Sequence, residues 1–77
     1  MREQRCLWDI QPGEKAVVRA LLNQGGMRRR LLDLGLIENT EVECLGRSPG
    51  GDPAAYRIRG AVIALRAADC ARILVSA

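Results

Sequence analysis

No run of apolar residues in this chain is longer than five, and this limit excludes most ways of building a core. The longest run, from Ala61 to Leu65, is far shorter than the about 18 residues that a membrane-spanning helix needs. Five residues match the length of an ordinary β-strand, in which side chains alternate between two faces. The chain is therefore expected to fold mainly from short strands.

The length and composition predict one small globular domain over residues 1–77. Hydrophobic residues make up 48% of the 77 residues and charged residues 27%, which excludes a disordered linker. Aromatic residues make up only 3%, so the core must consist of Val, Ile, Leu and Ala. A chain of this size hides only about 60% of the surface that it exposes when unfolded, so that core must be thin.

The charge and the residue types disfavour two classes of function. Twelve basic and nine acidic residues give a net charge of +3, which is low for a nucleic-acid-coating protein. The chain has one Trp and one Tyr for base stacking, so no nucleic-acid partner is expected. It contains no His, the usual general base near neutral pH, so no enzyme is expected and no catalytic residue is assigned.

The three cysteines do not form a recognisable site. Cys6, Cys44 and Cys70 are an odd number and no C-x-x-C motif occurs, so neither a disulfide framework nor a zinc knuckle is expected. Cys44 and Cys70 are expected to be small buried hydrophobes, with Cys6 as the most exposed thiol.

The first half of the chain predicts one strand and one helix. The segment at 16–22 is rich in apolar and β-branched residues, which predicts the first strand. Met27, Leu31 and Leu34 then recur at i, i+4 and i+7, which predicts a short helix that ends at Gly35 in a left-handed conformation. The expected buried face of the strand holds Ala16, Val18, Ala20 and Leu22.

The second half predicts four more strands. Polar and apolar residues alternate at 40–44 and 55–59, Gly60 marks a bulge or tight bend, and 61–65 and 73–75 follow as strands. Five short antiparallel strands and one helix predict a mainly β protein, a small barrel whose closure removes exposed edges. Turns are expected at 48–53 and 67–71, and inward side chains at Val42, Cys44, Tyr56 and Ile58.

Three carboxylates are the candidate metal ligands. Glu41 and Glu43 share the outward face of one strand, and Asp52 lies between Gly51 and Pro53. A solvated strand face and a turn-forming role for Asp52 are the simpler interpretations, because two carboxylates do not complete a coordination shell. No cofactor is expected, and any binding of ferrous iron is expected to be weak.

The densest positive charge is the triplet at 28–30. Successive helical residues point about 100° apart, so the three arginines cannot all face one partner. Arg29 has Asp33 four residues on as an expected intrahelical partner, which leaves Arg28 and Arg30 for an acidic protein surface or a phosphate. A solvated helix face is the simpler interpretation.

Trp8 and the loop at 48–53 complete the candidate partner-binding residues. An exposed Trp often marks a contact surface, although packing over the mouth of the barrel explains Trp8 equally well. The loop has two glycines but no following Lys-Ser or Lys-Thr, so it is not a phosphate-binding P-loop. Its candidate residues are Pro49, Gly50, Gly51, Asp52 and Pro53.

Several short motifs follow one another in a specific order. They are Leu7 with Ile10-x-Pro12-Gly13-Glu14, Arg30-Leu31-Leu32-Asp33-Leu34-Gly35-Leu36, the loop Pro49–Pro53, and Gly60 with Ile63-Ala64-Leu65-Arg66. Together they resemble the FeoA family, small proteins of bacterial ferrous iron uptake, from residue 7 to residue 75. The resemblance implies an SH3-like barrel. Glu38-Asn39 replaces the family's usual Pro-Gly, and Asn also tolerates a left-handed backbone.

The resemblance also implies a function. It implies a non-enzymatic accessory protein that binds the cytoplasmic part of the FeoB-type GTP-binding transporter and modulates iron uptake. With no apolar segment after the charged N-terminus, we expect a cytoplasmic location, reaching the inner face of the membrane only through that partner. A metal-responsive module, as in iron-dependent repressors, is the alternative, and a small nucleic-acid-binding barrel is less favoured. The oligomeric state stays open, a homo-oligomer included.

Overall fold

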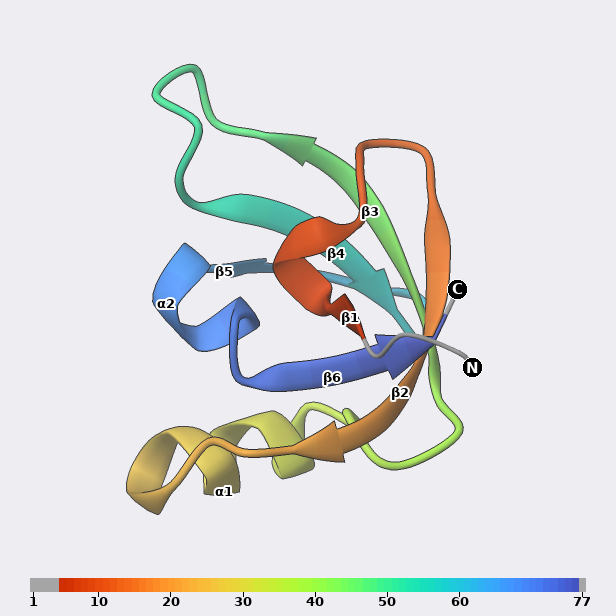
Figure 1. Cartoon of the computed structure of the whole chain (residues 1–77), viewed down its shortest axis with the longest axis vertical. Helices are drawn as coiled ribbons and strands as arrows, with labels where there is room; N and C mark the ends of the chain where they lie inside the picture. Colours follow the sequence, from red (N-terminus) through yellow and green to blue (C-terminus); the bar gives the residue numbers. More distant parts are fainter. Residues whose placement is uncertain (1–4, 77) are drawn as a thin grey trace.

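Antiparallel strands form a single curved sheet in the computed structural model, which describes residues 5–76 (Figure 1). Within these residues six strands follow the spatial order β1-β6-β2-β3-β4-β5. Their bounds are β1 Arg5–Cys6, β2 Lys15–Leu21, β3 Glu41–Arg47, β4 Ala54–Ile58, β5 Ala61–Leu65 and β6 Ile73–Ser76. The helical elements are the 3-10 turn η1 Leu7–Asp9 and the α-helices α1 Gly25–Asp33 and α2 Ala67–Cys70.

The mainly β architecture confirms the predicted fold class, with two corrections to its parts. The additional strand is β1, whose two residues are too few to show an alternating pattern. The expected turn at 67–71 contains the single-turn helix α2, so the protein has more than one short helix. Neither α1 nor α2 is long and apolar enough to cross a membrane, and no other helix within residues 5–76 is.

The inner face of the sheet carries the aliphatic core that the composition predicted. All four inward side chains predicted for β3 and β4 are at most 1% exposed. Leu31 of α1 is fully buried, and Met27 and Leu34 are partly buried and pack against the same core. The helical stripe therefore faces the barrel, as its spacing predicted.

Strand β2 departs from the predicted alternation. Ala16 and Val18 face the core, but the pairing of β2 with β6 shifts register between Val18 and Ala20. A bulge adds one residue to a strand and so reverses which side chains point inward. Leu21 is therefore partly buried against the core, and Leu22, predicted to face inward, is 52% exposed.

Helix α1 ends at Gly35 in a hydrogen-bonded cap. Gly35 has φ +99°, and its N–H donates to the C=O of Leu32 at 3.0 Å. The N–H of Leu36 donates to the C=O of Leu31 at 3.0 Å, and both leucines are fully buried. This is the Schellman arrangement, in which the left-handed residue lets the chain turn back and bury the following side chain.

Asn39, in the turn after α1, has the left-handed backbone that an Asn was expected to tolerate. Asn39 has φ 76°, and its N–H donates to the C=O of Val18 at 2.8 Å. Its side-chain oxygen also accepts a hydrogen bond from Arg19 at 2.8 Å. Asn39 thus ties the entry of β3 to β2 through both its backbone and its side chain.

Gly60 makes the predicted tight bend. Arg59 and Gly60, with φ 52° and 81°, form a two-residue turn between Ile58 and Ala61, which are paired across β4 and β5. Positive φ at both central residues is the type I′ geometry that suits a twisted hairpin.

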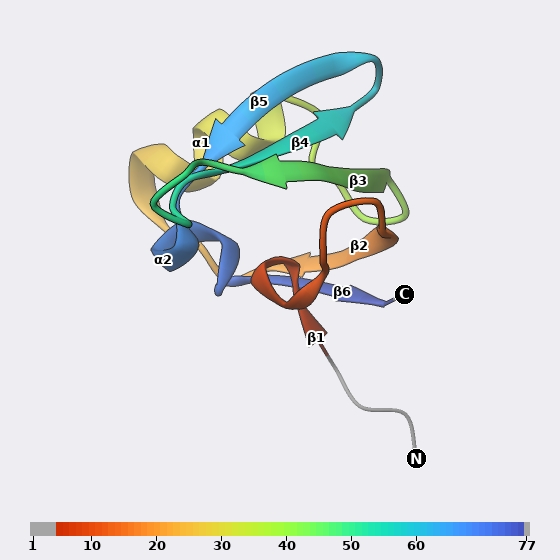
Figure 2. The ribbon, with the colours of Figure 1, turned by 90° about the horizontal axis from the view of Figure 1, so that it is seen from above.

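The predicted closure of the barrel is wrong in one respect. The strands at the two ends of the spatial order, β1 and β5, do not pair with each other. In the view of Figure 2, β5 is the outermost strand of its layer, and no other element lies beyond it. The sheet curves into a barrel but keeps an open edge, because residues 5–76 supply no further strand to bridge β5 and β1.

The Gly35 cap leads to a testable expectation for stability. Gly35→Val should lower the free energy of unfolding by about 1–2 kcal/mol or more, because a β-branched residue is strained at φ +99°. A Cβ at Gly35 would also lie 2.9 Å from Cδ of Arg59, but that side chain is flexible and can move. The backbone penalty should dominate, and thermal or urea melts measure the loss.

Two further variants separate the two contributions. Gly35→Asn should be milder, because Asn tolerates a left-handed backbone. Gly51→Val meets the same backbone penalty at φ +92°, with no atom within 4 Å of the new Cβ. Equal melting temperatures for Val and Asn at Gly35 would contradict this account of the helix end.

Candidate functional site

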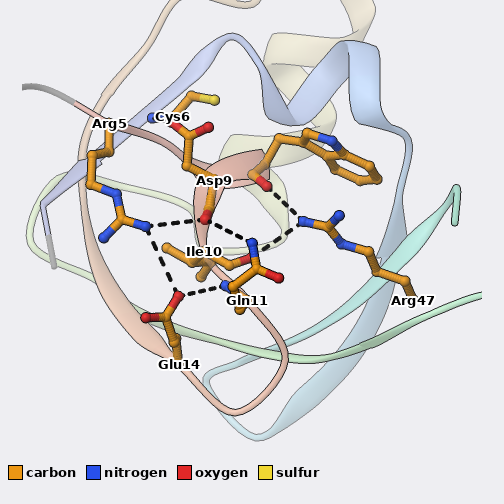
Figure 3. Close-up of polar contacts among 8 residues, drawn as sticks. Arg5, Cys6, Asp9, Ile10, Gln11, Glu14 and Arg47 are labelled. Atoms are coloured by element: carbon orange, nitrogen blue, oxygen red, sulfur yellow. Dashed lines mark hydrogen bonds and ion pairs between the residues drawn. The ribbon is translucent and has the colours of Figure 1, made fainter.

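The N-terminal turn is held together by its own polar groups (Figure 3). The Asp9 carboxylate accepts a hydrogen bond from the N–H of Cys6 at 3.0 Å, and the Glu14 carboxylate accepts one from the N–H of Gln11 at 2.6 Å. Arg5 donates to the C=O of Asp9 at 3.1 Å and lies 3.9 Å from the Glu14 carboxylate. Both carboxylates are thus engaged locally, and the turn is a structural element.

Arg47, the last residue of β3, fastens this turn to the sheet. Its guanidinium donates to the C=O of Trp8 at 2.7 Å and lies 4.2 Å from the centroid of the Trp8 ring. Trp8 is partly buried and packs against the core. Of the two explanations given for Trp8, packing over the barrel is the one that the structure confirms, with a cation–π contact on the indole.

The helix arginines differ from the predicted pattern. Arg28 is not free, because it donates to the C=O of Leu21 at 2.6 Å and so joins α1 to the end of β2. The expected pair between Arg29 and Asp33 does not form within 4 Å, since the ion pairs among residues 5–76 are Arg5–Glu14 and Arg57–Glu43. Arg30 is exposed, as expected.

The loop at 48–53 is an ordered turn. The N–H of Ser48 donates to the C=O of Pro53 at 2.9 Å, and the N–H of Gly51 donates to the C=O of Ser48 at 2.7 Å. The Asp52 carboxylate accepts a hydrogen bond from the N–H of Ala67 at 3.0 Å, at the start of α2. Asp52 therefore links the loop to α2, and Pro49 and Gly50 form its exposed tip.

The loop and the helix arginines do not form one surface. Figure 1 places the loop between β3 and β4 at one end of the long axis and α1 at the other end. Arg28 and Arg30 are therefore separate from residues 49–53, and one compact partner segment can contact only one of the two regions.

Of the two carboxylates on β3, Glu43 is paired with a cation. Register places Glu43 between Lys15 of β2 and Arg57 of β4, and its carboxylate lies 3.5 Å from the Arg57 guanidinium. Glu41 is exposed beside it, and Asp52 lies at the far end of β3 in the loop. In the part of the chain that the structure describes, no three Asp, Glu, Cys or His side chains come together as a metal site.

An apolar groove of about 370 Å³ lies on the outer face of β3, β4 and β5, beside the stem of the loop. Register pairs Gly46 with Ala55 and Ala55 with Ala64, so small residues cross all three strands. We call it the alanine groove. Arg47 contributes to its lining, but its guanidinium is directed to Trp8, and its Nε is buried without a hydrogen-bond partner among the described residues. The groove is lined by Leu45, Gly46, Arg47, Ser48, Pro53, Ala54, Ala55 and Ala64.

This groove was not predicted from the sequence. The predicted core residues are the inward ones of each strand, whereas Leu45, Ala55 and Ala64 lie at the outward positions between them. Apolar residues at outward strand positions are the sequence feature that could have indicated the groove, because outward positions that face water are usually polar. Their meeting in one groove depends on the pairing of three strands.

The buried thiols are chemically inert near neutral pH. Cys44 and Cys70 are fully buried, as expected, and Cys6 is the most exposed of the three. The Cys70 thiol donates to the Tyr56 hydroxyl at 3.5 Å. Burial is the largest cause that raises the pKa of Cys70 to about 11, and burial also raises the pKa of Cys44. A protonated thiol is a poor nucleophile, so neither supports covalent chemistry.

Known proteins resemble this chain over nearly its whole length. The model of the FeoA domain family matches residues 5–77. A fusion of Fe(2+) transport protein A with Fe(2+) transporter FeoB from Porphyromonas gingivalis is 30% identical over 69 residues. That match covers 90% of this chain and 8% of the fusion protein, so the chain spans a small part of that relative.

Solved structures share the fold. The FeoA-like protein of Clostridium acetobutylicum superposes with a TM-score of 0.86 at 32% identity, over 99% of this chain and 88% of that one. A FeoA of Stenotrophomonas maltophilia, described as a prokaryotic SH3 domain protein and complexed with zinc, has a TM-score of 0.84 at 26% identity. That match covers 94% of this chain and 89% of the other. The SH3-like barrel predicted from the sequence is confirmed.

The pairing of Glu43 leads to an expectation for metal content. Protein purified without oxygen should contain no stoichiometric transition metal, because the carboxylates of β3 lack further ligands and lie beside cations. Elemental analysis should be repeated after incubation with zinc or ferrous iron and dialysis. About one retained metal ion per chain, lost in Glu43→Gln, would contradict this expectation.

The buried pair Tyr56 and Cys70 leads to an expectation at high pH. Burial raises both pKa values, from 10.0 for Tyr56 and from 9.0 to about 11 for Cys70. Above pH 9 the unfolded chain loses these protons while the folded chain keeps them, so stability should be full below pH 9 and fall as pH rises. Tyrosinate absorbance should therefore appear together with loss of the circular dichroism of the fold.

The single tyrosine makes this titration specific to one residue. Tyr56→Phe keeps the ring and removes one titrating group, so its stability should fall less steeply with pH. Ionisation of Tyr56 with a midpoint at pH 10.0 in protein that is still folded would show that the hydroxyl is not protected by burial.

Proposed function

This chain belongs to the FeoA domain family, and we propose that it is a non-catalytic accessory protein of bacterial ferrous iron uptake. In this proposal it binds the cytoplasmic part of a FeoB-type transporter and modulates it. The chain would then work in the cytoplasm, at the inner face of the membrane, through that partner.

The relative from Porphyromonas gingivalis is the observation that carries the proposal. In that protein one chain combines Fe(2+) transport protein A with the transporter FeoB. A covalent link keeps two domains at a high effective concentration, so a weak contact between them is sufficient. Where the two are separate chains, the same association requires a surface on the small domain that binds the transporter.

The chemistry of the described residues supports a binding role. The chain has no His, the thiols of Cys44 and Cys70 are buried and protonated, and Glu43 is paired with Arg57. Asp9, Glu14 and Asp52 accept hydrogen bonds from backbone N–H groups. These groups are engaged in holding the fold, which leaves shape and surface as the means of action.

We place the contact at the alanine groove and the adjoining loop, residues 49–53. The groove offers an apolar depression into which a partner can insert a side chain, the usual arrangement at the centre of a protein interface. Ser48 and Pro53, at the base of the loop, line the groove. The Arg47 guanidinium is engaged with Trp8 on the inner side of the sheet, so the groove is apolar and fits an apolar side chain of the partner.

A charged side chain in the groove should disrupt this contact. Ala55→Arg should weaken binding to the isolated cytoplasmic domain of a FeoB-type transporter by at least about 10-fold, equivalent to about 1.4 kcal/mol. The melting temperature should change little, because the Ala55 side chain lies on the outer face of the sheet. Calorimetric titration with GDP-bound and GTP-bound domain measures both affinities.

Arg30→Glu is the matched control, since it reverses an exposed charge at the opposite end of the molecule. Loss of binding by Arg30→Glu with full binding by Ala55→Arg would move the contact to α1. Absence of binding by the unaltered protein in both nucleotide states would contradict the proposed function.

A further inference from the structure

Strand β5 has one hydrogen-bonded neighbour and one free side. Among the strands that the structure describes it pairs with β4 alone, and in Figure 2 no element lies beyond it. In an antiparallel hairpin with a two-residue turn, the residues that flank the turn form a hydrogen-bonded pair, and such pairs recur at every second residue. Ala61, Ile63 and Leu65 therefore bond to β4, and the N–H and C=O groups of Val62 and Ala64 point away from the sheet.

This free edge lacks the usual protection. Exposed edges are commonly blocked by a charged residue, a proline or a bulge, which prevents another strand from pairing. The sequence of β5 is Ala-Val-Ile-Ala-Leu, and its register with β4 is continuous. Val62 is 59% exposed, the largest exposure among the big hydrophobic residues of the described chain. The edge at β1 offers only two residues, so β5 is the longer template.

Both ends of β5 carry positive charge. Arg59 precedes the strand in the turn and Arg66 follows it, and both are exposed. Neither takes part in the ion pairs found in residues 5–76, which are Arg5–Glu14 and Arg57–Glu43. The aliphatic carbons of Arg59 lie over Gly35, beside the turn that leads into the strand.

These charges decide what can pair with β5. If a second copy of the chain paired antiparallel with Ile63 opposite Ile63, Arg66 of each copy would lie opposite Gly60 of the other, next to Arg59. A parallel pairing would place like arginines near each other. Charges of the same sign close together across paired strands repel, so a second copy is a poor occupant, and a strand flanked by carboxylates is a good one.

We propose that the edge of β5 accepts an extended segment of a partner protein as an additional strand. The segment alternates apolar or β-branched residues and carries Asp or Glu at its ends, opposite Arg59 and Arg66. Backbone bonds to Val62 and Ala64 supply affinity. The outward side chains of the segment lie next to Ala64, where the alanine groove opens. Only the identification of the partner as the transporter rests on the proposed function.

The first test removes one outward donor. Val62→Pro deletes an N–H that β4 does not use, and proline is tolerated at such edge positions. Binding to the transporter's cytoplasmic domain should weaken at least about 10-fold. The control Val62→Ala removes the side chain, keeps the N–H and should weaken binding far less. In the complex of the unaltered protein, amide exchange of Val62 and Ala64 should slow, a result that depends on no variant folding.

The second test needs no transporter. A short synthetic peptide of alternating Val and Thr with Glu at both ends should slow amide exchange at Val62 and Ala64 at low salt. The same peptide with Lys at both ends should bind at least about 10-fold more weakly, and Arg66→Glu should reduce that preference.

The outcomes separate this inference from the proposed function. Protection by the Glu peptide without any binding of the transporter domain would support the strand site and contradict the proposed partner. Full binding of the transporter domain by Val62→Pro, with no exchange protection on β5, would overturn strand addition and leave the proposed function standing. Dimers of the unaltered protein that Val62→Pro abolishes would overturn the choice of a foreign strand over a second copy.

Discussion

Burial of a thin aliphatic core inside a sheet that does not close is the constraint on which the rest of this structure depends. With almost no aromatic residues, the core gains its stability from many small side chains, and each end of the barrel must be covered. The turn η1 covers one region with Leu7, and α1 covers another with Leu31. Arg47 holds η1 in place, and the cap at Gly35 holds α1. These contacts keep water from a core that has little volume to lose.

The small size of the core also limits which groups are available for function. Polar groups in or beside the core make hydrogen bonds that stabilise the fold. Cys70 bonds to Tyr56 inside the core, and Asp52 accepts a hydrogen bond at the start of α2. What remains available is the outer surface of β3, β4 and β5, where small residues leave a groove and β5 leaves an unpaired edge. The proposed accessory role beside a large transporter depends on these two features of the surface.

Prediction from the sequence succeeded where one local pattern determines the outcome. Alternation at 40–44 and 55–59 identified the buried faces of β3 and β4, because a paired strand with one wet face has a period of two. It failed at β2, where the register shift beside Val18 reverses the pattern and exposes Leu22. That shift arises from pairing with β6, whose residues lie far along the chain, so no local window contains the information.

The sequence by itself determined the fold class, the absence of His and the stop of α1 at Gly35, because these follow from residue types and short spacings. The tertiary structure decided which residues can act together. It bound Arg28 to the backbone of Leu21, placed the loop and α1 at opposite ends, and brought Gly46, Ala55 and Ala64 into one groove. Such groupings depend on which distant strands pair and in what register, and pairing is a property of the folded sheet as a whole.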